Sequence, residues 1–291
     1  PGVIRAENRT EFNGQIGVLQ SAFPCAEIRR VEFGSFDDPD RRIVPEVQKV
    51  VADMDRNVGP LPLHLVGYSQ GVVTELRTLA QDPAIGKRTR SVLAMNGASH
   101  GSEAADFAID VMNKMGSCDD SWVPGCSFAK GRALKYLVEQ FFHVSLSADN
   151  GTDLLTTILK EKKVGMQSLT TKYANDFWAG GRDPQHVVAA NIPVNAPDAL
   201  FYTFRSTITN VDEDPNKGNL PSSQIASFNL VWDRSGRPDS PFNDMQVRLD
   251  NHTLGGPVAE REVVSNDQDH VAGRARAIVR FPAQQPYTAA Q

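Results

Sequence analysis

The sequence predicts an α/β protein whose mostly parallel sheet is flanked by helices. Short apolar runs of strand character alternate with helix-like segments. One of these runs, residues 63–66, leads directly into the tight Gly-Tyr-Ser-Gln-Gly turn at 67–71. The composition is 40% hydrophobic and 22% charged over 291 residues, which is typical of a globular chain with one large α/β domain.

The predicted elements follow one another in a regular order. Strand character occurs at residues 2–6 (weakly), 26–33, 63–66, 90–95, 199–205 and 263–264, and helix-like segments lie at 15–22, 45–56 and from the turn to about 81. Strands that alternate with helices in this way favour parallel pairing with helices on both faces. A polar loop follows at 209–222, and the last ten residues resemble a loose tail.

Residues 103–191 interrupt this order with amphipathic helices, including 134–144 and 154–160, and show no strand character. We therefore expect a helical insertion between two parts of one core, residues 1–102 and 192–291. The aromatic side chains of the insertion either line a channel or belong to a core, and core is the commoner role. They are Phe141, Phe142, Phe177 and Trp178.

The turn at 67–71 has the form of a nucleophile elbow. A chain that reverses this sharply between a strand and a helix holds the central Ser69 in a strained conformation, and the small residues Gly67 and Gly71 are expected to give it room. The backbone N–H of Gln70 would then lie at a helix N-terminus, where it can stabilise an oxyanion. This pattern indicates acyl transfer through a serine ester, although a Ser between glycines is often only a turn.

A serine nucleophile requires an imidazole that takes its proton and a carboxylate that orients the imidazole. These groups follow the nucleophile in the order acid, then His. His270 follows a short strand and a polar loop, which is the place expected for the base, whereas His252 resembles a turn residue. The four other histidines precede this region and favour structural or surface roles. They are His64, His100, His143 and His186.

Position alone leaves the acid open among four aspartates, Asp212, Asp214, Asp239 and Asp244. Other motifs bear on this choice. Residues 97–107 read Gly-Ala-Ser-His-Gly-Ser-Glu-Ala-Ala-Asp-Phe, residues 168–171 Ser-Leu-Thr-Thr, and residues 201–204 Phe-Tyr-Thr-Phe. Asn-Asp-Met-Gln-Val follows at 243–247 and Asp-His-Val-Ala at 269–272.

Together with the elbow and its helix, these segments resemble the bacterial triacylglycerol lipases of the Pseudomonas and Burkholderia type. The resemblance implies an α/β-hydrolase fold in which residues 103–191 form a helical lid. It also implies hydrolysis of carboxylic esters, with Asp244 as the acid and His270 as the base. The motifs beyond the elbow are loose, and their order and spacing carry the resemblance.

The chain departs from this family at three places. The family's calcium ligands correspond to Ala272 and Arg276, which offer no side-chain oxygen, so we expect no metal there. The His-Gly that shapes the family's second oxyanion donor is replaced by Ala-Glu-Asn-Arg at 6–9, which leaves a backbone N–H near Asn8 or Arg9 as the candidate. Met245 also replaces a glycine of the acid loop.

Charge and cysteine content restrict the partners and the compartment. The net charge of −5 gives no basic footprint for nucleic acid, and no apolar run is long enough to cross a bilayer. Cys118 and Cys126 bracket a short loop that either closes as a disulfide in an oxidising compartment or carries two reduced thiols at the surface, and Cys25 is left over. No signal peptide is visible, yet the chain opens on Pro1, so a leader is permitted, and we expect a secreted or periplasmic protein.

The sequence therefore predicts a cofactor-free serine hydrolase that acts on hydrophobic acyl esters and contacts lipid surfaces at most transiently. Its expected site comprises Ser69, Asp244 and His270, with Gln70 and Asn8 as oxyanion donors. Two alternatives stay open: a phospholipase or cutinase-like polyester hydrolase, and a non-catalytic lipid-binding relative that keeps the fold.

Overall fold

The computed structural model describes residues 13–31, 33, 37–116, 163–180, 187–207, 247, 249–256 and 258–266. The four strands are β1 (Leu63–Tyr68), β2 (Thr89–Met95), β3 (Leu200–Thr207) and β4 (Glu260–Asn266). The longer helices are α2 (Asn13–Ala22), α3 (Val44–Val58), α4 (Gln70–Gln81), α6 (Glu103–Gly116) and α9 (Thr171–Trp178). The shorter ones are η1 (Pro39–Ile43), α5 (Pro83–Arg88), η2 (Ala189–Asn191), α10 (Ile192–Asn195) and η5 (Leu249–His252).

The strands form one parallel sheet in the order β1-β2-β3-β4. Tyr68 at the end of β1 pairs with Met95 of β2, and Met95 pairs with Phe204 of β3. Thr207 and Asn266 pair at the ends of β3 and β4. Because all four strands run the same way, the segments that follow them emerge at one edge of the sheet, which is where ligands bind in open α/β sheets.

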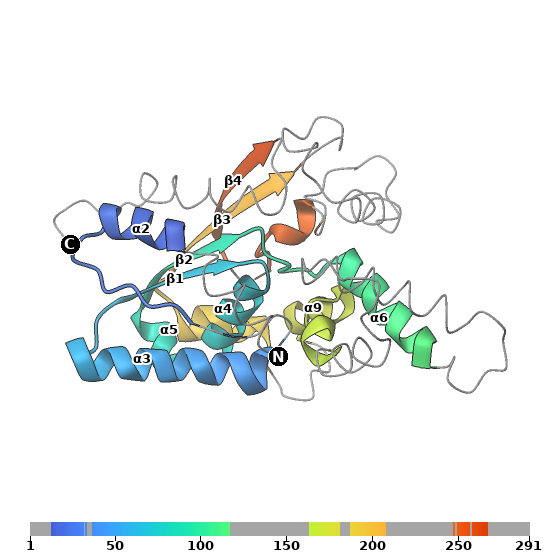
Figure 1. Ribbon diagram of the computed structural model, residues 1–291, viewed down its shortest axis with the longest axis horizontal. Coiled ribbons are helices and arrows are strands. Elements are labelled where there is room, and N and C mark those ends of the chain that lie inside the picture. Colours follow the sequence, from blue (N-terminus) through green and yellow to red (C-terminus); the bar gives the residue numbers. More distant parts are fainter. Residues whose placement is uncertain are drawn as a thin grey trace, which may run out of the picture.

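Helices cover both faces of this sheet (Figure 1). On one face, the side chains of Leu93 and Met95 pack with Tyr202 and Phe204, and Leu19 of α2 lies against them. Alternate residues of β2 point to the opposite face, toward α4. Both faces of β2 are thus buried, as expected of a central strand in a parallel sheet.

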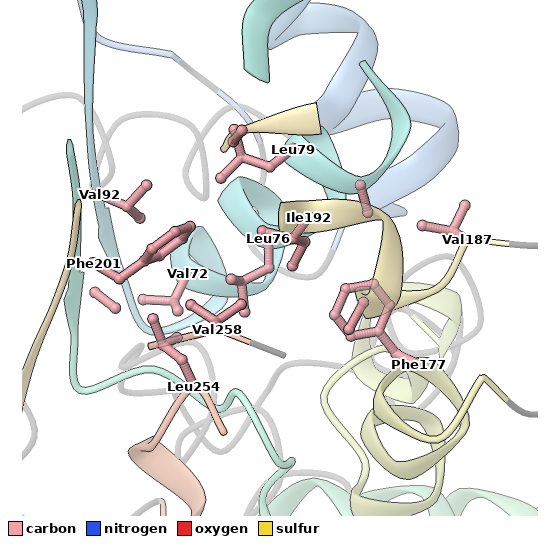
Figure 2. Close-up of a cluster of buried hydrophobic side chains, with 14 residues drawn as sticks. Val72, Leu76, Leu79, Val92, Phe177, Val187, Ile192, Phe201, Leu254 and Val258 are labelled. Atoms are coloured by element: carbon pink, nitrogen blue, oxygen red, sulfur yellow. The ribbon is translucent and has the colours of Figure 1, made fainter. Parts of the chain in front are cut away.

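The larger core lies between α4 and the sheet (Figure 2). Val72, Leu76 and Leu79 of α4 are spaced along one helix face and pack on Val92 and Phe201 of the strands. Full burial of each such side chain stabilises the fold by roughly 1.5–3 kcal/mol. The same cluster includes Phe177 of α9, Ile192 of α10, and Leu254 and Val258, which lie between η5 and β4. The core therefore joins segments from both sides of the predicted insertion.

Local sequence signals explain several helix boundaries. Asp82 caps α5, since its carboxylate accepts hydrogen bonds from the backbone N–H groups of Ala84 and Ile85, and Pro83 occupies the first turn. Gly59 ends α3 with a φ of 81°, a conformation that favours glycine. A smaller core of Val47, Val51, Leu63 and Ile85 joins α3 to β1 and α5.

One predicted strand is absent. Residues 26–31 and 33 have no regular secondary structure, although the sequence predicts a strand at 26–33. Val31 still packs against the core between α3 and β1, and Glu27 forms an exposed ion pair with Arg29. The side-chain pattern therefore places the segment against the core, but a strand also requires backbone pairing, which the pattern does not supply.

The other predictions for described segments agree with the structure to within a few residues at each end. α2, α3, α4, β2, β3 and β4 form where helices and strands are expected. Within the predicted insertion, the described parts form α6, α9 and η2 and contain no strand. The predicted strand at 2–6 and the predicted helices at 134–144 and 154–160 lie outside the described residues. In the described part of the chain, no helix combines the length and apolar composition of a membrane span.

Candidate active site

The turn between β1 and α4 holds Ser69 in a rare backbone conformation, with φ 54° and ψ −117°. A residue that carries a Cβ occupies such a region only where the surrounding structure enforces it, and such strain is common at functional sites. The backbone N–H of Ser69 donates to Met95 O at 3.0 Å, and Ser69 O accepts from Val72 N at 3.1 Å as α4 begins. The strand and the helix thus hold Ser69 from both sides.

Gly67 is required at this turn because Glu75 lies against it. A Cβ at Gly67 would lie 2.6 Å from Glu75 Cδ and 2.9 Å from the backbone carbon of Gly71, closer than real Cβ contacts allow. Gly71 differs, since a Cβ there would meet nothing within 4 Å. The expectation that both glycines give room to the turn therefore holds for Gly67 and is wrong for Gly71.

Gln70, the first residue of α4, fixes the helix start on a second segment. Its side chain is buried and donates through Nε2 to Asp37 O at 3.0 Å. Its backbone N–H lies at the helix N-terminus, where the helix dipole favours negative charge. A developing oxyanion beside Ser69 would therefore meet a rigidly held donor.

The loop after β2 runs close to the same turn. Asn96 has φ 45°, and its Oδ1 accepts from Ser206 N at 3.0 Å, which ties the end of β2 to the end of β3. A Cβ at Gly97 would lie 2.6 Å from Val72 Cγ1, so only glycine lets this loop touch the first turn of α4. Ser69 and Asn96 are the two non-glycine residues with positive φ in the described chain, and they follow adjacent strands.

The segment at η5 closes over this loop. His100 N donates to Asn251 O at 3.0 Å, and Asn251 Nδ2 donates to Glu103 Oε1 at 3.1 Å. His252 is fully buried, and its Nδ1 lies 3.1 Å from Gly97 O. The sequence predicts a turn residue at this position, whereas His252 lies in the short helix η5 and is buried against Gly97.

A stacked aromatic pair connects the loop after β2 to α9. The His100 and Trp178 rings lie 5.1 Å apart at an interplanar angle of 21°, and Trp178 Nε1 donates to Ser99 O at 2.7 Å. Burial lowers the pKa of His100 below its ordinary value. A Cβ at Gly255 would lie 2.8 Å from His100 Nε2, so the chain that leads to β4 passes directly beside the imidazole.

The start of α9 is fixed to α6. Asp106 accepts from Thr171 N at 3.1 Å and from Thr171 Oγ1 at 2.7 Å, and Thr170 caps the helix through Tyr173 N. These bonds satisfy donors of the first turn of α9 that the helix itself leaves without partners. The two described helices at the ends of the predicted insertion are therefore attached to each other.

A buried ionic group attaches α9 to α4. Arg77, with a side chain 1% exposed, donates to Asp40 through Nε, at 2.5 Å, and through Nη2. Gln81 Nε2 and Tyr173 Oη also donate to Asp40, at 2.6 and 3.2 Å. The guanidinium lies 4.9 Å from the Tyr173 ring centroid and 5.4 Å from that of Phe177. Phe177 and Trp178 both pack with the large core, as the commoner role of such aromatic residues predicts.

The structure places the predicted site residues unequally. Ser69 and Gln70 lie at the carboxyl edge of the sheet, while Asn8, Asp244 and His270 lie outside the described residues. β4 ends at Asn266, which pairs with Thr207, so the chain leaves β4 toward His270 at the edge that carries Ser69. The described residues hold no group of three or more His, Cys, Asp or Glu side chains that could bind a metal ion.

Sequence reasoning missed Glu75. Its side chain lies on the buried face of α4, both carboxyl oxygens have no hydrogen-bond partner among the described residues, and burial raises its pKa well above the ordinary value. The signal in the sequence is its place in the helix, since Glu75 lies between Val72 and Leu79 on the face that carries the core residues.

No family model matches the sequence, and no curated protein matches it. Among solved structures, the Bacillus licheniformis lipase BlEst2 in its mature form has a TM-score of 0.49 and 17% identity, over 85% of this chain and 72% of that one. Its propeptide form has a TM-score of 0.47 and 16% identity, over 85% and 42%. A metagenomic carboxyl esterase has a TM-score of 0.43 and 18% identity, over 84% and 61%.

The architecture itself identifies the fold class. The described strands are all parallel and helices cover both faces of the sheet. A serine with strained backbone joins the end of a strand directly to the start of a helix. These are the features of the nucleophile elbow and of the sheet that presents it. The chain has the α/β-hydrolase fold.

Proposed function

We propose that this protein is a carboxylic ester hydrolase of the lipase and esterase kind, with Ser69 as its nucleophile. The observation that carries the proposal is the backbone of Ser69, with φ 54° at the junction of β1 and α4. Structure of this kind pushes a serine hydroxyl out at the sheet edge and leaves the next backbone N–H beside it. A serine that only formed a turn would gain neither an exposed hydroxyl nor a neighbouring N–H donor in return for its strained backbone.

In the proposed reaction, Ser69 Oγ attacks the ester carbonyl carbon while the imidazole of His270 takes the hydroxyl proton. The carbonyl oxygen becomes an oxyanion that accepts hydrogen bonds from Gln70 N–H and from a backbone N–H near Asn8. Collapse of this intermediate forms the acyl-enzyme and breaks the bond to the alcohol, which leaves with the proton from His270. Water, deprotonated by His270, then releases the carboxylic acid and restores Ser69. The reaction requires no cofactor.

Asp244 is the proposed acid that orients His270. It precedes η5, whose residues Asn251 and His252 bond to the loop after β2, so a short segment connects Asp244 to the edge where Ser69 lies. Asp212 and Asp214 are the alternatives, because they follow the end of β3 at Thr207. All three agree with the order of nucleophile, acid and base.

Hydrophobic acyl esters are the proposed substrates, and a triacylglycerol-lipase-like specificity is the finer form of the proposal. Its support is the resemblance to the Pseudomonas and Burkholderia lipases, together with the position of α9. This helix continues the insertion and presents apolar side chains to α4 just beyond Ser69. A secreted or periplasmic location and a transient contact with lipid surfaces belong to the same proposal.

Hydrolysis of p-nitrophenyl esters of short and long acyl chains tests this function. Ser69→Ala and His270→Ala are expected to lower kcat by at least about a thousandfold, because nucleophile and base act together. Ser21→Ala is the matched control, since the Ser21 hydroxyl is exposed and bonds only within α2, to Gly17 O. It is expected to retain full activity.

The same assay identifies the acid and the specificity. Asp244→Asn is expected to lower kcat by several orders of magnitude while Asp212→Asn and Asp214→Asn retain activity, and the reverse result would transfer the role of acid. Rates that rise with acyl length favour a lipase. A folded parent protein that hydrolyses none of these esters would contradict the proposal and favour a non-catalytic lipid-binding role.

A further inference from the structure

Glu75 is an ionisable group beneath the nucleophile that the proposed mechanism does not use. The residue is 8% exposed, and both carboxyl oxygens lie in the interior with no hydrogen-bond partner among the described residues. A buried carboxylate without partners is far less stable than the neutral acid, because it loses its hydration and gains nothing in return. The environment therefore favours the protonated form.

Among the described residues, no cation pairs with Glu75 to replace the lost hydration. Burial is the cause that raises the pKa of Glu75, and no charge contributes to it. The charged and titratable side chains of the helices and strands that pack against α4 have other described partners. These pairs are Asp40 with Arg77, Arg41 with Asp38, Arg42 with Asp37, Glu46 with Lys49, Asp53 with Arg56, Asp55 with Arg88, Arg90 with Asp198, Lys172 with Asp176, and His64 with Ser91. Lys87 of α5 is exposed, and Tyr68 of β1 packs on the other face of the sheet.

The carboxyl group also has a direct mechanical connection to the elbow. It lies against the α-carbon of Gly67, where a Cβ would come within 2.6 Å of Glu75 Cδ. Gly67 is part of β1, and the strained Ser69 follows it after one residue. A Glu75 side chain that moved toward water would therefore leave empty the space under Gly67, at the β1 end of the turn.

We infer that Glu75 is a positioning residue of the nucleophile elbow: as a neutral acid it fills the space under Gly67 and holds Ser69 in place, and loss of its proton loosens the elbow. The part of this inference that concerns activity rests on the proposed ester hydrolysis. The part that concerns the elbow does not.

The test compares the parent protein with Glu75→Gln, which has nearly the same shape and cannot ionise. Glu46→Gln is the control, because it removes one carboxylate from the exposed surface of α3. Glu75→Met is a second variant that also cannot ionise. Its side chain is apolar, so it serves if the polar Gln side chain prevents folding. Hydrogen exchange of the 63–75 segment is measured for each protein at several values between pH 5 and 9, and the proteins are compared at equal pH.

The exchange of parent and Glu75→Gln is expected to agree near pH 5 and to diverge toward pH 9. At the high end of this range, the elbow amides of the parent should exchange at least about tenfold faster than those of Glu75→Gln. A pKa difference of one unit between the closed and the opened elbow changes the opening equilibrium by this factor. Glu46→Gln should follow the parent throughout. Equal exchange of parent and Glu75→Gln at every pH would overturn the inference.

Ester hydrolysis across the same pH range completes the test. The parent should lose kcat on the alkaline side, and Glu75→Gln should retain its own level there with little change in KM. If the exchange diverges and neither protein hydrolyses esters, the inference on the elbow holds and the proposed function fails. If both proteins are active with the same alkaline profile, the function holds and the inference fails.

Discussion

The carboxyl group of Glu75 lies against the α-carbon of Gly67, directly under the turn that carries Ser69. A side chain from α4 therefore occupies the space that a Cβ at position 67 would need. This relationship explains why one glycine of the Gly-Tyr-Ser-Gln-Gly sequence is required by packing and the other is not.

The two elbow glycines are expected to respond differently to alanine. Gly67→Ala should destabilise the protein by about 1–3 kcal/mol, because the new methyl group overlaps Glu75 and the backbone of Gly71. Gly71→Ala should be neutral or stabilise by up to about 1 kcal/mol, since the site is open and alanine favours helix. Urea unfolding measures both, and equal losses in the two variants would contradict this packing.

Loss of one partner of the buried Asp40 and Arg77 pair should destabilise the protein more than loss of both charges. Arg77→Met is expected to cost about 3–5 kcal/mol, because it leaves a buried carboxylate whose remaining side-chain donors among the described residues are Gln81 and Tyr173. Arg77→Met combined with Asp40→Asn should recover much of this loss. Unfolding in urea gives the coupling energy.

The control for that pair is Lys49→Met, which breaks the exposed pair with Glu46 and should change stability by less than about 0.5 kcal/mol. Tyr173→Phe removes one hydrogen bond to Asp40 and should cost about 1 kcal/mol. A loss in Arg77→Met no larger than that in Lys49→Met would show that the ionic group does not attach α9 to α4.

His100 is expected to weaken the fold in acid. Burial lowers its pKa below the ordinary 6.5, so the unfolded chain takes up a proton before the folded protein does. The neutral imidazole therefore contributes stability above about pH 6.5, and this contribution is lost as the pH falls through the lowered folded value. Compared with His100→Gln, the parent should lose stability in thermal unfolding as the pH falls below the ordinary value of 6.5.

This comparison isolates His100 because both proteins keep His64, whose pKa burial also lowers. Both proteins also keep Glu75. Parallel pH profiles for parent and His100→Gln would mean that the imidazole in the stack with Trp178 does not resist protonation.

The sequence predicted most of the fold because its local patterns and its packing agree. The helix after Ser69 and the strand 90–95 form where their apolar periodicity places them. Residues 26–33 show the limit of such patterns, since Val31 reaches the core but the backbone does not pair into a strand. Pairing depends on a neighbouring strand, and no local pattern encodes that neighbour.

The sequence predicted the turn at Ser69 but not the packing around it. The turn at Ser69 is encoded locally by its neighbours, so the motif predicts its strained backbone. The close approach of Glu75 to β1 and the open space at Gly71 depend on how the side chains of α4 pack in three dimensions, which the local sequence does not encode. The acid and the base follow different strands and meet Ser69 only through the fold, so the sequence predicts their order and leaves Asp244 to be tested against Asp212 and Asp214.

The assignment of Ser69 as nucleophile is tested most directly by covalent labelling with a p-nitrophenyl alkylphosphonate, which reacts with an activated serine. Mass spectrometry of the digested protein then locates the adduct. We expect one adduct on the peptide that contains Ser69, release of one equivalent of nitrophenol, and no adduct in Ser69→Ala. A folded parent protein that stays unlabelled, or that carries its adduct on another residue, would contradict the assignment of Ser69 as nucleophile.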